Sequence, residues 1–440
     1  MAIALHQLHA QQGPTMDQRY TGVVARALRD DERRVPTDER QTPLVIEPLR
    51  SRDSTCLQEV LASHSPQIME DIARHGAVLL RGFDLTSPAD FEREVLSIRG
   101  MRGLNEVLMS EAGRTVVKGT RFVLFTNANY KTGGTLEHPM FHTENYYVAD
   151  VPHYISFFCI KPSWLGGETG LLNTARLYAD LPDTLRAKLE QQPFAVREYS
   201  VADVAARYGL SPEEVQEFCT RSGVPTTTRD GRQSMMVYKP SVVEHPTTHE
   251  RAFVINFGGE LNSVGLGPSV AAAFAEDYAG SRWLVHRFHW RFPSVIPSAT
   301  LFGGLFVRPL AAWPYLGFKI SRLFTRRGNK KGGSSTAGAR VGGLFERDEI
   351  EILARAMRRR YSSFLWKRGD LLILDNLTMA HAGMPGFGPR NLKALICNCV
   401  PLPYSGGTSG LCAPGIDESR ECLGAQLVKY RQDMSATAPS

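Results

Sequence analysis

The sequence predicts an α+β protein that is mainly β, with its strands in a sandwich or barrel and helices beside them. Short strand-like runs separated by glycine, proline and asparagine fill residues 115–175, and this density is typical of sandwiches and barrels. Helical patterns occupy 57–76, 176–222 and 347–362. Of the 440 residues, 42% are hydrophobic and 22% charged, so the chain can bury a large core, which excludes a disordered protein or a fibre.

The individual elements carry their own signals. The helix over 57–76 has apolar residues at helical spacing, and Gly76 ends it as a C-cap. The apolar run AVLLRGFDL then predicts a strand over 77–85. Further on, Ser211 and Glu214 stand three residues apart in a capping-box pattern, which predicts a helix start.

The order of these elements predicts one decorated domain. Residues 1–42 are charge-rich and lack a sustained period, so we expect a flexible polar leader. The domain then covers 43–400, with an insertion at about 260–345, and residues 401–440 form a C-terminal extension.

Charge and cysteine content narrow the partners and the compartment. The formal net charge of +6 is small for this length, so no nucleic-acid partner is expected. Seven cysteines at irregular spacings, without C-x-x-C, predict thiols in a reducing cytosol and not a disulfide framework. We expect Cys397 and Cys399 to be packed thiols, and the N-terminus lacks a secretory signal, so the predicted location is cytoplasmic.

One segment stands apart in charge. From Lys319 to Arg340 there are seven basic residues and no acidic one, around a Gly/Ser-rich centre. This pattern is typical of a solvated loop. Because an apolar stretch precedes it, the alternative is that 300–340 docks an acidic carrier protein or an anionic membrane surface.

Three residues have the character of metal ligands. His142 and Glu144 lie two apart in FHTENYY, so on a strand both side chains project from one face. His381 follows the apolar run DLLILDN, which places a second imidazole after another strand. Two imidazoles and one carboxylate form the facial triad of non-haem Fe(II) oxygenases, which leaves coordination positions open.

Two further residues fit a dicarboxylate beside such a metal. Arg390 follows His381 by nine residues, and a turn between them would bring its guanidinium back toward the metal. A guanidinium fork is suited to bidentate recognition of a carboxylate. Thr169 in GGETGLLN offers a hydroxyl for the same group.

Taken together, these motifs closely resemble the TauD/TfdA family of Fe(II)- and 2-oxoglutarate-dependent dioxygenases. The matching segments are FHTENYY, HYISFFCIKPSWLGGETGLLN, WKRGDLLILDNLTMAHAGMPGFGPR, HGAVLLRGFDL and VVEHPTTHERAFVINFG. The H-x-E form and GGET look most like the SyrP-like branch, which is associated with natural-product assembly. The similarity covers roughly residues 57–260 and 345–400 in the family's order.

The resemblance implies a double-stranded β-helix, or jelly-roll, with the metal between two sheets. His142, Glu144 and His381 map onto the iron ligands, and Thr169 and Arg390 onto the groups that hold the distal carboxylate of 2-oxoglutarate. With Fe(II), 2-oxoglutarate and O₂, the family forms a ferryl-oxo species that abstracts hydrogen from a small-molecule substrate. Members that halogenate lack the carboxylate ligand, so Glu144 favours hydroxylation or desaturation over halogenation.

Several other residues are assigned more weakly. Asn127 and Tyr130 are candidates for the substrate pocket, with turn formation as their alternative. Arg81 is a third pocket candidate, and a structural salt bridge is its alternative. His153 and Trp366 are expected to pack, and Asp375 and Asn376 to brace the loop that orients His381. His245 and His249 are four residues apart, but Pro246 between them argues against a metal-binding pair on a helix.

The leading hypothesis is an oxygenase that hydroxylates an amino acid or an amino-acid-derived intermediate in secondary metabolism, either free or tethered to a carrier. A second hypothesis keeps the iron site but ends in desaturation, cyclisation or epoxidation. A third is a non-catalytic binding or regulatory protein on the same fold.

Overall fold

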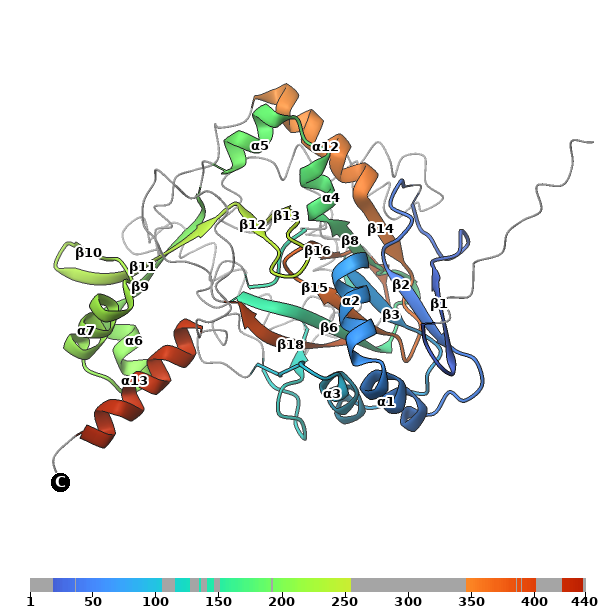
Figure 1. Ribbon diagram of the computed structural model, residues 1–440, viewed down its shortest axis with the longest axis horizontal. Coiled ribbons are helices and arrows are strands. Elements are labelled where there is room, and N and C mark those ends of the chain that lie inside the picture. The colour runs from blue at the N-terminus through green and yellow to red at the C-terminus, as the bar shows by residue number, and fades with distance from the viewer. Residues whose placement is uncertain are drawn as a thin grey trace, which may run out of the picture.

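Two facing β-sheets form the centre of the protein, and helices cover their outer faces (Figure 1). The computed structural model describes residues 19–35, 37–104, 115–126, 134–135, 141–145, 151–190, 193–254, 346–384, 386–388, 390–400 and 422–437. The expected insertion at about 260–345 lies outside these residues.

The larger sheet has seven strands in the order β1-β2-β3-β15-β6-β18-β4. They are β1 Val23–Ala27, β2 Leu44–Pro48, β3 Ala77–Leu80, β15 Leu371–Asp375, β6 Val151–Lys161, β18 Asn391–Val400 and β4 Leu124–Phe125. Neighbouring strands run antiparallel except β2 and β3, which are parallel. Strands from both ends of the chain therefore meet at the centre of one sheet.

The smaller sheet faces it with the order β14-β8-β16. Its strands are β14 Tyr361–Phe364, β8 Thr169–Asn173 and β16 Met379–Gly383. A bridge between His142 and His381 sets the segment 141–145 beside β16. Short strands form two further pieces, namely β5 Gly134–Thr135, β17 Gly386–Phe387 and β7 Leu165–Gly166 in one, and β12 Val242–Glu244 with β13 Arg251–Phe253 in the other.

One hydrophobic core lies between the two sheets. On β6, Ile155 and Phe157 face this inner core, whereas Tyr154 and Phe158 face the helices on the other side. This alternation follows from the two-residue period of a strand. Leu171 of β8 contributes to the inner core from the opposite sheet, so residues on its side of β8 point toward the space between the sheets.

Helices cover both outer faces. The larger sheet is covered by α1 Ser54–Ser63, α2 Ser65–His75 and α3 Pro88–Ser97. The smaller sheet is covered by α4 Thr174–Ala179, α5 Asp183–Glu190 and α12 Arg347–Arg360. The single helix expected over 57–76 is two helices, because Pro66 lacks an amide hydrogen to continue α1 and lies in the first turn of α2, which begins at Ser65. The predicted C-cap is confirmed, since Gly76 has a φ of 72°.

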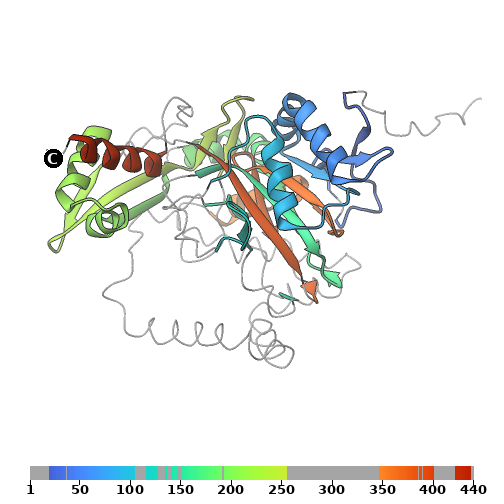
Figure 2. The ribbon, with the colours of Figure 1, turned by 90° about the horizontal axis from the view of Figure 1, so that it is seen from below.

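A small lobe stands beside the sheets and has a hydrophobic core of its own. It contains β9 Pro193–Ser200, β10 Thr226–Arg229, β11 Arg232–Pro240, α6 Val201–Tyr208, α7 Pro212–Ser222 and α13 Leu423–Thr437. Figure 2 shows α13 lying against the lobe, at the opposite end of the molecule from α1. The capping box of Ser211 and Glu214 is present at the start of α7, as expected.

The structure corrects the expected boundary of the leader. Residues 23–27 form β1 and pair with β2, so the described residues from 19 onward belong to the domain. Arg26 on β1 is buried and forms ion pairs with Glu32 and Glu47. Part of the charge of this segment therefore serves internal pairing, whereas its composition predicted solvation alone.

The structure also corrects the cysteine prediction. Cys399 at the end of β18 forms a disulfide with Cys422, just before α13. Cys397 remains a buried thiol, as expected. In the described part of the chain, no helix is long and apolar enough to cross a membrane. The predicted docking segment 300–340 lies outside that part.

Candidate metal centre

The three predicted metal ligands lie together on the inner side of the smaller sheet. His142 and His381 are bridged by two backbone hydrogen bonds of 3.1 and 3.0 Å. The Nε2 atoms of both imidazoles lie 3.5 Å from Oε2 of Glu144. The sequence spacing predicted the pairing of His142 with Glu144, and the sheet register supplies His381.

The donor set and its spacing fit one metal ion. Ligands at about 2.1 Å from one ion lie roughly 3.0–3.4 Å from each other, close to the separations found here. These separations exceed an ordinary N–H···O hydrogen bond. Glu144 and His381 are buried, whereas the side chain of His142 is 30% exposed. The cluster is thus reached from the side of His142.

Asn376 holds the backbone of Glu144. Its Oδ1 accepts the Glu144 N–H at 2.7 Å, and its Nδ2 donates to the Glu144 carbonyl at 3.0 Å and to the Pro152 carbonyl at 2.9 Å. The Asn376 side chain is fully buried. The sequence assigned Asn376 to the loop before His381, but these contacts show that it also fixes the carboxylate ligand.

Thr169 and Arg390 also meet, as predicted. Nη2 of Arg390 donates to Oγ1 of Thr169 at 3.0 Å, and both residues are buried. In the register of β8 and β16, Leu171 lies opposite His381. Thr169 is two residues from Leu171 and therefore projects from the same face as His381.

Sequence reasoning missed the part played by Trp366. This residue is buried in the core, as predicted, but its Nε1 also donates to Oγ1 of Thr169 at 2.9 Å. A buried tryptophan usually finds a partner for its N–H, and this general rule was the available signal. The identity of the partner depends on strands that are far apart in the sequence.

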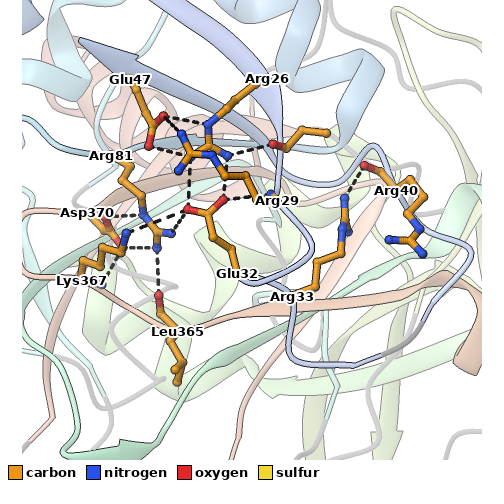
Figure 3. Close-up of polar contacts among 11 residues, drawn as sticks. Arg26, Arg29, Glu32, Arg33, Arg40, Glu47, Arg81, Leu365, Lys367 and Asp370 are labelled. Carbon is orange, nitrogen blue, oxygen red and sulfur yellow. Dashed lines mark hydrogen bonds and ion pairs between the residues drawn. The ribbon is translucent and has the colours of Figure 1, made fainter. Parts of the chain in front are cut away.

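Arg81 belongs to a buried ion-pair network (Figure 3). Its Nη2 donates to Asp370 at 2.7 Å and to the Leu365 carbonyl at 2.9 Å, and its Nη1 donates to Glu32 at 3.0 Å. Burial lowers the pKa of Arg81, but the hydrogen bonds and charges of Asp370 and Glu32 outweigh this effect and raise it. These contacts match the salt-bridge alternative for Arg81 and not a place in a substrate pocket.

The other two pocket candidates, Asn127 and Tyr130, lie outside the described residues, so their role stays a prediction.

A second cluster joins His153, His245 and Asp375. Nε2 of His245 lies 2.7 Å from Oδ2 of Asp375 and 3.3 Å from Nε2 of His153. Nδ1 of His245 accepts the backbone N–H groups of Thr247 and Thr248. This hydrogen-bond pattern assigns the ring proton to Nε2. His245 therefore donates to Asp375 and does not offer Nε2 to a metal.

The histidines also stabilise the ionised form of Asp375. Burial alone would raise the pKa of Asp375, but hydrogen bonds from His153 and His245 hold it well below its usual range. Oδ1 of Asp375 accepts the N–H of Leu377 at 2.9 Å. The cluster thus anchors the turn that carries Asn376, which confirms the bracing role expected for Asp375.

The chain is similar to a known protein family and to known proteins. The family model described as "Taurine catabolism dioxygenase TauD, TfdA family" matches residues 46–292, more than half of the chain. The dapdiamide synthesis protein DdaC of Enterobacter agglomerans is 25% identical over 167 residues, which are 37% of this chain and 48% of that protein. The match therefore spans about half of that relative.

Solved structures with a similar arrangement include PvcB, described as an Fe, alpha-ketoglutarate dependent oxygenase from an isonitrile synthetic pathway. Its TM-score is 0.43 at 14% identity, over 86% of this chain and 92% of PvcB. A taurine dioxygenase from Burkholderia xenovorans has a TM-score of 0.41 at 15% identity, over 88% of this chain and 94% of that one. On the match to the family model, the chain belongs to the TauD/TfdA family.

Proposed function

We propose that this protein is an Fe(II)- and 2-oxoglutarate-dependent dioxygenase that hydroxylates an amino acid or an amino-acid-derived intermediate, either free or carried on a partner protein. The observation that supports this most is the convergence of His142, Glu144 and His381, in which Nε2 of each histidine lies 3.5 Å from Oε2 of Glu144. We also propose that the two facing sheets are the halves of a double-stranded β-helix, with the metal held between them.

In this proposal His142, Glu144 and His381 hold the iron. Bound iron supplies a centre at which 2-oxoglutarate and O₂ are combined to oxidise a C–H bond of the substrate. The carboxylate of Glu144 keeps one coordination position for the protein, which favours oxygen transfer over halide transfer. Asn376 keeps this carboxylate in place through the Glu144 backbone.

Arg390 and Thr169 hold the distal carboxylate of 2-oxoglutarate. A buried guanidinium forms strong hydrogen bonds with a carboxylate because both groups are charged and their geometries match. Burial of both side chains excludes water from competing for these bonds. Thr169 projects from the same face as His381, so a dicarboxylate of suitable length can reach both the iron and this pair.

The test is an anaerobic titration of the Fe(II)-loaded protein with 2-oxoglutarate, followed by an assay of succinate release over a panel of free and carrier-bound amino acids. His142→Ala and Glu144→Ala are expected to abolish iron binding and turnover. His249→Asn is the matched control, because the His249 side chain is 74% exposed and asparagine tolerates its φ of 56°. Normal turnover in His142→Ala would refute the iron assignment.

Product mass separates the outcomes that share this iron site. A gain of one oxygen atom indicates hydroxylation or epoxidation, and a loss of two hydrogen atoms indicates desaturation or oxidative cyclisation. Failure of the wild-type protein to bind Fe(II) and 2-oxoglutarate would instead favour the non-catalytic binding protein.

A further inference from the structure

The Thr169 hydroxyl accepts two hydrogen bonds from donor-only groups. Nε1 of Trp366 reaches Oγ1 at 2.9 Å, and Nη2 of Arg390 reaches it at 3.0 Å. All three residues are buried. Neither an indole N–H nor a guanidinium can accept a hydrogen bond in return. The oxygen of Thr169 is thus an acceptor in both contacts.

These two contacts determine where the hydroxyl proton lies. A hydroxyl oxygen has two lone pairs and one hydrogen, so two accepted bonds leave its hydrogen in the one remaining direction. Oγ1 of Thr169 makes no further hydrogen bond to the residues that the structure describes. The O–H group is therefore available as a donor to a ligand, and its rotation is restricted.

The position of Trp366 is itself well determined. In the register of β14 and β8, Phe364 lies opposite Thr169, and Trp366 follows Phe364 by two residues. The two aromatic rings pack edge to face, with centroids 5.0 Å apart. Between them, the Leu365 carbonyl is held by the buried Arg81 at 2.9 Å (Figure 3). The indole therefore has little freedom to move away from the hydroxyl.

We propose that Trp366 is a positioning residue that makes the distal cosubstrate site a set of donors only, and so selects an ionised carboxylate over an amide. This inference rests on the proposed function of Thr169 and Arg390. A carboxylate accepts hydrogen bonds through both oxygens, whereas a carboxamide brings an NH₂ group that needs an acceptor. Because the Thr169 hydroxyl is held as a donor, it cannot accept a hydrogen bond from that NH₂ group. Burial of the NH₂ group without an acceptor is unfavourable.

The test compares two ligands on the Fe(II)-loaded protein by anaerobic calorimetry. They are N-oxalylglycine, a non-reacting analogue of 2-oxoglutarate, and N-oxalylglycinamide, which differs in having a distal carboxamide. The wild-type protein is expected to bind N-oxalylglycine about 100-fold or more tightly than the amide. With the amide, the charge-assisted hydrogen bonds to Arg390 are lost, and one N–H group of the ligand is buried without an acceptor. The readout is binding, so it does not depend on turnover.

Trp366→Phe removes the indole N–H and keeps a buried aromatic ring. Its affinity for N-oxalylglycine is expected to fall about 5-fold, the usual effect of one neutral hydrogen bond. The freed hydroxyl can then rotate and accept from an amide, so the preference for the carboxylate should fall about 10-fold. Trp366→Met, a second large side chain without a donor, replaces it if Trp366→Phe does not fold.

Two variants separate positioning from packing. In a Thr169→Val background, Trp366→Phe should not change the preference, because the hydroxyl that it orients is gone. Phe91→Leu, in the fully buried outer core on α3, should lower stability and leave the preference at its wild-type value.

An unchanged preference in Trp366→Phe, or an equal change in the Thr169→Val background, would overturn the inference alone. Failure of the wild-type protein to bind N-oxalylglycine would overturn the proposed function together with it.

Discussion

Replacing Asn376 with alanine tests whether the carboxylate ligand is held through its backbone. The Asn376 side chain makes three hydrogen bonds of 2.7 to 3.0 Å, to the N–H and carbonyl of Glu144 and to the carbonyl of Pro152. The Asn376 side chain is fully buried. Asn376→Ala therefore removes the hydrogen-bond partner of these three backbone groups. A buried polar group that loses its partner costs about 1–3 kcal/mol.

After partial relaxation, the three losses should lower the free energy of unfolding by about 3–5 kcal/mol. This is a large part of the roughly 5–15 kcal/mol that stabilises a typical domain. The Glu144 carboxylate would also lose its fixed position, so the affinity for Fe(II) should fall about 10- to 100-fold, as for other residues that orient metal ligands. Urea unfolding of the metal-free protein and anaerobic Fe(II) titration measure the two effects separately.

Asn173→Ala provides the matched control. Asn173 is also a buried asparagine, and it caps α4 by accepting the N–H of Arg176 at 2.9 Å. Its loss should cost about 1 kcal/mol without changing Fe(II) affinity. If folded Asn376→Ala binds Fe(II) as tightly as the wild-type protein does, the backbone clamp does not position the ligand.

Three further predictions concern stability. Arg81→Met should lower the free energy of unfolding, measured in urea, by about 3–5 kcal/mol, because it leaves the buried carboxylate of Asp370 without its cationic partner. The double variant Arg81→Met/Asp370→Leu should lose less stability, and an equal loss in both variants would contradict the prediction. Burial favours the protonated form of Glu32, but hydrogen bonds from Arg26 and from the Arg29 backbone, together with the charges of Arg26 and Arg81, outweigh it and lower its pKa to about 2. This depressed pKa contributes stability that is fully present above the ordinary glutamate pKa of 4.5 and is lost as the pH falls toward about 2. Glu32→Gln should therefore flatten the acid side of a plot of stability against pH, and an unchanged acid side would count against the pairing. Cys399→Ser removes the disulfide to Cys422, which is 23 residues away. The free energy of unfolding, followed by thermal unfolding monitored at α13, should fall by about 3 kcal/mol. A reductant should lower the stability of the wild-type protein and leave that of the variant unchanged.

Local patterns were sufficient for elements whose signals lie within a few residues. The capping box of Ser211 and Glu214 formed as predicted, because both partners are in one helical turn. The helix over 57–76 was predicted in position but not in its break, although Pro66 is the signal for it. The leader expected over 1–42 extended too far along the chain, because charge-rich composition describes solvation, whereas Arg26 on β1 finds its acidic partners within the fold.

The sequence by itself determined the chemistry available to this protein. The residue types and the two-residue spacing of His142 and Glu144 predicted two of the three ligands on one strand face, since strand geometry is local. The fold decided which distant residues complete it. Asn376 meets Glu144 across 232 residues, and Trp366 meets Thr169 across 197. Such contacts depend on strand order and register, which are set when the two sheets pack against each other. The residues next to Asn376 or Trp366 in the sequence therefore do not predict them.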